Sequence, residues 1–175
     1  MGYTVVRPWG YNRYGEDRFN KFLKTVPEKL RRRIYEAQPK DWYPAKDAYT
    51  LLDLIRAEFG QEGFEDYVHY LFTESVSGFM RGLASFINPE SLSKRTNAMW
   101  LRIHSHGRVE PVITGKNSVQ YTLYDWEAGR VSCELFEIWL CELLLMSRAK
   151  SVEIQKTHCV HDGHPFCRWD VRFTT

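Results

Sequence analysis

The sequence lacks the signatures of the common enzyme classes. It contains no GxxxxGK(S/T) phosphate loop, no GxSxG nucleophile elbow, no HExxH zinc motif and no GxGxxG dinucleotide loop. Its carboxylates are scattered, so none can be paired as general acid and base from the sequence. These absences indicate that the chain is not an enzyme.

A strong charge of one sign and long apolar runs are also missing. The 24 Lys and Arg residues nearly balance the 22 Asp and Glu residues, which leaves a net charge of +2 and no broad field for nucleic acid. The longest apolar runs, such as 143–146, are far shorter than the roughly 20 residues that span a bilayer. We therefore expect a soluble cytoplasmic protein that binds no nucleic acid and has no membrane span.

Cysteine is scarce, because the chain has only four, all of them between residues 130 and 173. This usage suits a reducing compartment better than a disulfide framework. The composition, 43% apolar and 15% aromatic, is enough for a substantial core. We expect a single domain over residues 16–175 after an irregular arm at residues 1–15, which is rich in Gly, Tyr, Arg and Pro.

Apolar residues recur at helical spacing from residue 16 to about residue 105. The pattern and its Pro, Asn and Gly boundaries predict helices over 16–25, 27–37, 44–59, 64–87 and 88–105, with Gly60 and Gly107 as stops.

Beyond Gly107 the period changes from helical to two, which is typical of strands. Strands are predicted at 108–114, 118–126, 151–159 and 166–173, with a buried helix at 131–149 between the two hairpins. Val152 and Ile154 have the opposite parity to Cys159, and a bulge between Ile154 and Cys159 would turn all three inward. The predicted class is α+β, a four-stranded antiparallel sheet packed against an N-terminal helical bundle.

The last hairpin places two cysteines face to face. If its turn is centred near Gly163, Cys159 and Cys167 lie opposite one another, and Cys133 in the first turn of the buried helix could bring in a third sulfur. Three interpretations remain open: a shared metal ion, buried free thiols, or a Cys159–Cys167 disulfide. Cys141 is two turns further along the helix, about 12 Å from Cys133, and cannot share the site.

Cys133 together with the Cys159-x-x-x-Gly163-x-x-x-Cys167 spacing resembles the C-terminal half of the 4-vinyl reductase domain. That domain shares its fold with TRAPP-type tethering subunits and, more remotely, with haem nitric-oxide-binding domains. The whole chain also resembles a bacterial family of unknown function. The resemblance implies a dimeric α+β domain with a small-molecule pocket and a structural zinc.

The zinc ligands that the resemblance implies are Cys133, Cys159 and Cys167. Metal-binding members carry a carboxylate three residues before the first hairpin cysteine, where this chain has Lys156, and a protonated lysine cannot be a ligand. The fourth ligand would come from His158, which we select, or from His161, His164, Glu153 or water.

His104 and His106 form a candidate haem or metal ligand pair, although histidine near a helix end also serves the helix dipole. The Tyr-x-Ser-x-Arg signature of the haem nitric-oxide-binding domains is absent. The sequence therefore argues against haem.

The function we favour is a sensor that binds a small apolar or aromatic molecule among five aromatic residues, Tyr70, Phe79, Trp100, Phe136 and Trp139. The alternative for these side chains is ordinary core packing. We expect the sensor to be a homodimer that signals through a separate output protein. Two other classes stay open: a ligand-free scaffold of the tethering-subunit type, and a metal- or cofactor-using enzyme of tetrapyrrole or aromatic metabolism.

Overall fold

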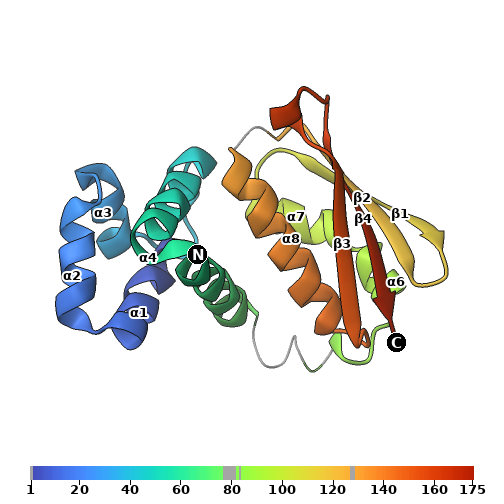
Figure 1. Cartoon of the computed structure of the whole chain (residues 1–175), viewed down its shortest axis with the longest axis horizontal. Helices are drawn as coiled ribbons and strands as arrows, with labels where there is room; N and C mark the ends of the chain where they lie inside the picture. Colours follow the sequence, from blue (N-terminus) through green and yellow to red (C-terminus); the bar gives the residue numbers. More distant parts are fainter. Residues whose placement is uncertain (1, 77–81, 83, 127–128) are drawn as a thin grey trace. The chain divides into compact units, whose positions relative to one another are not determined.

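The structure, a computed structural model, describes residues 2–76, 82, 84–126 and 129–175 (Figure 1). Its contacts divide the chain into two compact units, Met1–Val76 and Ser77–Thr175, which are described separately below. The first is helical and the second contains a four-stranded antiparallel sheet, so the predicted α+β class is confirmed. The single domain expected over residues 16–175 stays a prediction.

The first unit consists of four helices: α1 Gly2–Tyr14, α2 Glu16–Thr25, α3 Glu28–Glu36 and α4 Ala45–Ser75. The helices predicted over 16–25 and 27–37 correspond to α2 and α3. In the described part of the chain, no helix is both long enough and apolar enough to cross a membrane.

The irregular arm predicted for residues 1–15 is wrong, because α1 occupies nearly all of it. Three side chains at helical spacing, Tyr3, Val6 and Trp9, are buried against the rest of the unit. Pro8 lies inside the helix, where its missing N–H removes one backbone hydrogen bond. Tertiary burial of one face therefore outweighs the weak local helix signal.

Gly60 interrupts the helix, as predicted. Its φ of 75° and ψ of −176° are not helical, so α4 consists of two helical segments that meet at a kink. Glycine accepts this positive φ at no steric cost, and a side chain there would be strained. The two helices predicted over 44–59 and 64–87 are thus the two arms of α4, which ends at Ser75.

An aromatic cluster fills the first unit. The Trp9 ring meets four other rings with centroids 4.9–5.9 Å apart, those of Tyr14, Phe19, Phe59 and Tyr67. The Trp9 indole N–H donates to Asp66 at 2.7 Å, which satisfies the polar atom of an otherwise buried side chain.

The second unit contains two short helices, α6 Pro89–Ser93 and α7 Thr96–Ile103, where the sequence predicted one. Strands β1 Arg108–Gly115 and β2 Ser118–Tyr124 follow, and then α8 Arg130–Leu145. The chain closes with β3 Ser151–His158, the short 3₁₀ turn η1 Val160–Asp162 and β4 Cys167–Thr174. The Asn88 side chain caps α6 by accepting from the Ser91 N–H.

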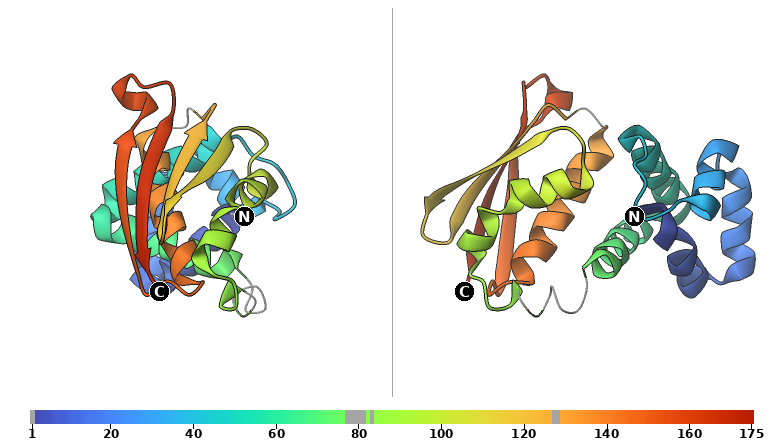
Figure 2. Two further views of the ribbon diagram at one scale, coloured as in Figure 1. Left: turned by 90° about the vertical axis from the view of Figure 1, so that its right-hand side faces the viewer. Right: turned by 180° about the vertical axis from the view of Figure 1, so that it is seen from behind.

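The strands run side by side in the order β1-β2-β4-β3 (Figure 2, left). Register places Tyr121 of β2 opposite Trp169 of β4, and both are fully buried. The buried residues of β4 alternate with exposed ones, as predicted. Helix α8 contacts β3, α7 contacts β1 and α6 contacts β2, so helices meet the sheet along its width.

The predicted bulge in β3 is confirmed. Ile154 pairs with Val171 and Lys156 with Trp169, but the register shifts between Lys156 and His158. The extra residue turns Cys159 inward, where it is 1% exposed.

Candidate functional site

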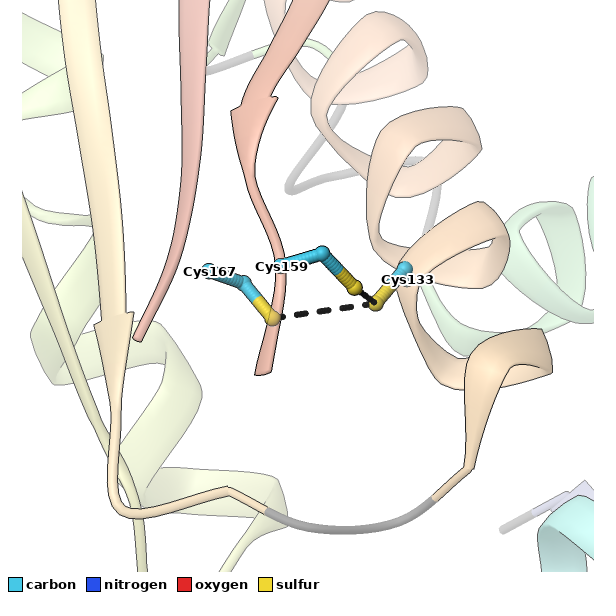
Figure 3. Close-up of side chains that lie close together, drawn as sticks. All are labelled: Cys133, Cys159 and Cys167. Carbon is cyan, nitrogen blue, oxygen red and sulfur yellow. Dashed lines mark hydrogen bonds between the residues drawn. The ribbon is translucent and has the colours of Figure 1, made fainter. Parts of the chain in front are cut away.

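Three elements bring three cysteines together, as Figure 3 shows. Cys133 lies in the first turns of α8, Cys159 follows the bulged end of β3, and Cys167 opens β4. The αL conformation of Gly163 (φ 87°) returns the chain between the last two. The predicted meeting of these thiols is confirmed.

The three sulfurs form a compact and dry cluster. The Cys133 Sγ lies 3.9 Å from the Cys159 Sγ and 3.8 Å from the Cys167 Sγ. All three sulfur atoms are within 4.8 Å of one another, and each residue is only 1–2% exposed. All are free cysteines, so the disulfide interpretation does not describe this state. Cys141, also on α8, is half-buried and is not a member of this cluster.

The pKa values of Cys133 and Cys167 are shifted in opposite directions. The hydrogen bond between Cys133 and Cys167 lowers the pKa of Cys167 to about 6, and the Val160 N–H, 3.4 Å from its sulfur, acts in the same direction. The same thiol hydrogen bond, together with burial, raises the pKa of Cys133. Of Cys133 and Cys167, Cys167 is therefore the one that more readily becomes a thiolate.

No fourth metal donor joins the sulfurs among the described residues. The candidate ligand atoms within 4.8 Å of one another are the three sulfurs, and His158 is not one of them. The His158 Nδ1 lies 3.1 Å from the Thr157 hydroxyl, and its ring packs against His164 and Phe166. The Lys156 ammonium pairs with Glu137 of α8 at 3.8 Å.

The predicted ligand-binding aromatics are partly brought together. Phe136 of α8 meets Trp100 of α7 edge-on at 5.7 Å and stacks on Trp139 at 5.8 Å. Trp100 and Phe136 are 3% and 1% exposed, which is the packing expected of core residues. Half-buried Tyr70 belongs to the first unit, and Phe79 lies outside the described residues. A ligand among these residues stays a prediction.

His104 is held between indole rings just after α7 ends. Its ring stacks on Trp100 at a centroid distance of 3.7 Å and meets Trp126 edge-on at 4.8 Å. Its Nδ1 is buried with no hydrogen-bond partner. Burial lowers the pKa of His104 to about 4, although the backbone of Trp100 opposes part of the shift. The imidazole is therefore neutral at physiological pH, the form that binds a metal.

His106 has a different setting although it lies only two residues away. It is exposed, its ring tilts against Trp126 at 4.7 Å, and its Nδ1 lies 3.4 Å from the Ser105 hydroxyl. Its carbonyl accepts the Trp100 indole N–H at 3.1 Å. The two histidines of the predicted pair thus differ in burial and environment.

Solved structures resemble this chain over its whole length. An H-NOX protein from S. oneidensis in the Fe(II)NO ligation state has a TM-score of 0.73 at 14% identity, covering 100% of this chain and 99% of that chain. The chain has the H-NOX fold. The unliganded Fe(II) H-NOX protein from K. algicida gives 0.70 at 12% identity, covering 99% and 95%. A structure described in terms of haem redox potential and porphyrin distortion has a TM-score of 0.63 at 11% identity, covering 98% of this chain and 97% of that chain.

Sequence-level comparisons add nothing to the fold match. No family model matches the chain. No curated protein matches it either. The shared fold with haem nitric-oxide-binding domains is confirmed, and the more specific resemblance to 4-vinyl reductase domains gains no support from these matches.

The expected zinc cofactor is wrong. The solved proteins of this fold are described in Fe(II) states and in terms of haem. The site itself gives a physical reason, since structural zinc sites use four donors and only three sulfurs meet in the described chain. Sequence reasoning named His104 but assigned it an ordinary helix-end role. Its burial and unpaired Nδ1 depend on Trp100 and Trp126, a tertiary arrangement that no local pattern encodes.

Proposed function

We propose that this chain is a haem-binding sensor module in which His104 would bind the haem iron. The observation that carries the proposal is the His104 imidazole, neutral and held between two indoles, with a buried Nδ1 that has no hydrogen-bond partner. A proximal histidine is a common way to hold haem iron in proteins. The H-NOX fold of the chain supports the same assignment.

The residues around His104 fit an apolar macrocycle. Leu101 and Ile103, at the end of α7, are 51% and 55% exposed although both are large and apolar. Exposed apolar side chains beside a neutral donor are typical of a surface that a ligand covers. The Tyr-x-Ser-x-Arg signature is absent from the chain. The proposal therefore depends on His104, and the test is directed at it.

When bound, haem iron would supply an open coordination position for a small gas. The protein's part is to hold His104 in one orientation, which the stacked Trp100 ring does, and to keep it unprotonated, which burial does. A homodimer and a separate output protein belong to the same proposal. A change in the ligands of the haem iron at His104 would be transmitted to such a partner through α7 and through strand β1, which α7 contacts.

The test is a haem titration of the purified chain followed by Soret absorbance, with native mass spectrometry of the same samples. We expect one haem per chain and a dimeric mass. His104→Ala should abolish the Soret shift of ligated haem, whereas His106→Ala, the matched control two residues away, should keep it. In His104→Gly, added free imidazole should restore the spectrum.

Several results would contradict the proposal. If the parent chain shows no Soret shift, the module is not a haem protein and the ligand-free scaffold gains support. If His104→Ala binds haem as the parent does, the axial ligand is another residue. Circular dichroism of each variant separates loss of the ligand from loss of the fold.

A further inference from the structure

A cluster of aromatic rings and guanidinium groups lies on the face of the sheet that points away from the buried core. Its members come from the four strands and from the turn between β3 and β4, and all are exposed or half-buried: Arg108, Tyr124, His158, His164, Phe166 and Arg168. We propose that this outer cluster binds a free nucleotide, that is, a planar base that carries a phosphate ester.

The strand register places the outer cluster on one face of the sheet. Arg108 lies opposite Tyr124, and Arg168 lies opposite His158. Residues directly opposite one another point to the same side of a sheet, whereas neighbours along a strand point to opposite sides. Trp169, which follows Arg168, is fully buried in the core. The outer cluster is therefore on the side that the core does not occupy.

Phe166 is the centre of the outer cluster. Its ring centroid lies 5.5 Å from that of Tyr124 and 5.3 Å from that of His158. The His164 ring continues the row, 4.7 Å from the His158 ring. Half-exposed rings on an open sheet are a surface on which a planar base can stack.

Both guanidinium groups are already stacked on rings of the outer cluster. The Cζ of Arg108 lies 4.5 Å from the Tyr124 ring centroid, and the Cζ of Arg168 lies 4.5 Å from the Phe166 ring centroid. Stacking fixes the plane of a guanidinium and leaves its N–H edge free for bidentate binding of a phosphate. The outward face of a stacked guanidinium can also receive a base.

The positive charge of these groups is only partly neutralised. The Arg168 Nε donates to the Thr122 hydroxyl at 3.1 Å, and no carboxylate pairs with Arg168 among the described residues. Arg108 pairs with Glu110 at 3.3 Å, but these side chains are 55% and 48% exposed, and an exposed pair of this kind contributes little. A phosphate would therefore meet one unpaired guanidinium and one weakly paired guanidinium.

The charges on the rest of the outer face favour one phosphate over a nucleic-acid strand. Asp170 follows Arg168 on the same face of β4 and accepts a hydrogen bond from Gln120 at 2.8 Å. Exposed Glu153 of β3 lies opposite Arg172. A polyanionic strand that crossed the sheet would meet both carboxylates, which repel phosphate. The positive region is limited to one end of the sheet, which suits a single nucleotide.

The experiment is a titration of the full chain with adenosine monophosphate (AMP), followed by the shifts of the backbone amide signals in NMR spectra. We expect saturable binding of one AMP per chain, with the largest shifts at residues of the outer cluster. Adenosine and ribose phosphate each lack one half of the ligand. Each should bind roughly tenfold more weakly or worse, because base stacking and a charge-assisted phosphate contact contribute about equally.

Two variants and one matched control test the geometry. Arg168→Lys keeps the positive charge but loses the planar stack and the bidentate edge, so it should weaken AMP binding by roughly tenfold. Phe166→Leu removes the central ring and should have an effect of similar size. Arg172→Lys makes the same exchange further along β4 on the same face and should leave the affinity unchanged. If a variant does not fold, the shift pattern of the parent chain decides.

The proposal would be overturned by the absence of saturable AMP binding, or by shifts that lie outside the outer cluster. It would also be overturned if ribose phosphate bound as tightly as AMP, because an anion contact alone would then explain the binding. An adenylate oligonucleotide that binds far more tightly than AMP would indicate a nucleic-acid surface instead, and an unchanged affinity in Arg168→Lys would exclude the stacked guanidinium. No probe contains haem and His104 is outside the outer cluster, so failure here is distinguishable from failure of the sensor proposal.

Discussion

A buried hydrogen-bond chain between β2 and α6 offers a quantitative test of the second unit. The Tyr121 hydroxyl donates to the Ser93 Oγ at 2.6 Å, and Ser93 in turn donates to the Pro89 carbonyl at 2.7 Å. Both side chains are fully buried. Burial raises the pKa of Tyr121 to about 12, so the hydroxyl keeps its proton at physiological pH and remains a donor. Tyr121→Phe and Ser93→Ala remove the bond from opposite ends.

The two substitutions should differ in their cost. Tyr121→Phe removes a donor while Ser93 keeps its bond to Pro89, so we expect a loss of about 1 kcal/mol in the free energy of unfolding. Ser93→Ala leaves the Tyr121 hydroxyl buried without its acceptor, which costs roughly 1–3 kcal/mol. The double variant removes both partners of the bond, so neither a buried donor nor a buried acceptor is left unpaired. The double-mutant cycle should therefore give a coupling energy of about 1 kcal/mol between Tyr121 and Ser93.

The assay is urea unfolding of the four proteins of this double-mutant cycle, followed by far-UV circular dichroism. For a chain of this size, each kcal/mol also corresponds to roughly 2–4 °C in the thermal midpoint. Tyr124→Phe is the matched control, because Tyr124 lies on the same strand but is only half-buried. Its ring centroid lies 4.5 Å from the Arg108 guanidinium. Its cost should stay within about 0.5 kcal/mol.

The reasoning would be refuted by a coupling energy near zero, because Tyr121 and Ser93 would then not share a bond in solution. A Tyr121→Phe variant as stable as the parent would equally show that the hydroxyl contributes nothing. A control that loses as much as Tyr121→Phe would point to a general effect of changing tyrosine in β2.

Two further predictions concern the first unit. A Cβ at Gly10 would lie 2.2 Å from the Phe19 ring, so Gly10→Ala should lower the free energy of unfolding by a net 1–2 kcal/mol or so despite the better helix propensity of alanine. A Cβ at Gly115 would meet nothing within 4 Å, so the control Gly115→Ala should leave the free energy of urea unfolding unchanged. Burial alone would raise the pKa of Asp47, but the hydrogen bond from Lys29 and nearby positive charge outweigh it and lower that pKa. Its stabilising effect is therefore present above pH about 4 and is lost as pH falls through the lowered pKa. Asp47→Asn should be less stable than the parent at pH 7 by roughly 1 kcal/mol, and this difference should shrink as pH falls below about 4 through the lowered pKa. A difference that does not shrink in acid would contradict this.

The sequence was most informative where structure depends on neighbours along the chain. The alternation of Cys167, Trp169 and Val171 predicted their burial, and the conflict of parity between Ile154 and Cys159 predicted the bulge. Both are period-two features that a strand displays locally. The same locality let the turn at Gly163 place the two hairpin cysteines together.

The sequence failed where a structure depends on distant partners. Residues 2–14 have little helical pattern of their own, yet α1 forms because Trp9 is buried among rings that include Phe59 and Tyr67. Zinc was expected from spacing and resemblance, although spacing does not report whether a fourth donor arrives.

What the amino-acid order determined by itself is the succession of most elements and the pairing of the two hairpin thiols, because turn residues and hydrophobic period act within a few residues. Tertiary structure alone decided the state of His104. Its neutral charge and unpaired Nδ1 come from indoles four residues before it and 22 residues after it, and side-chain burial is a property of the packed unit rather than of the local sequence.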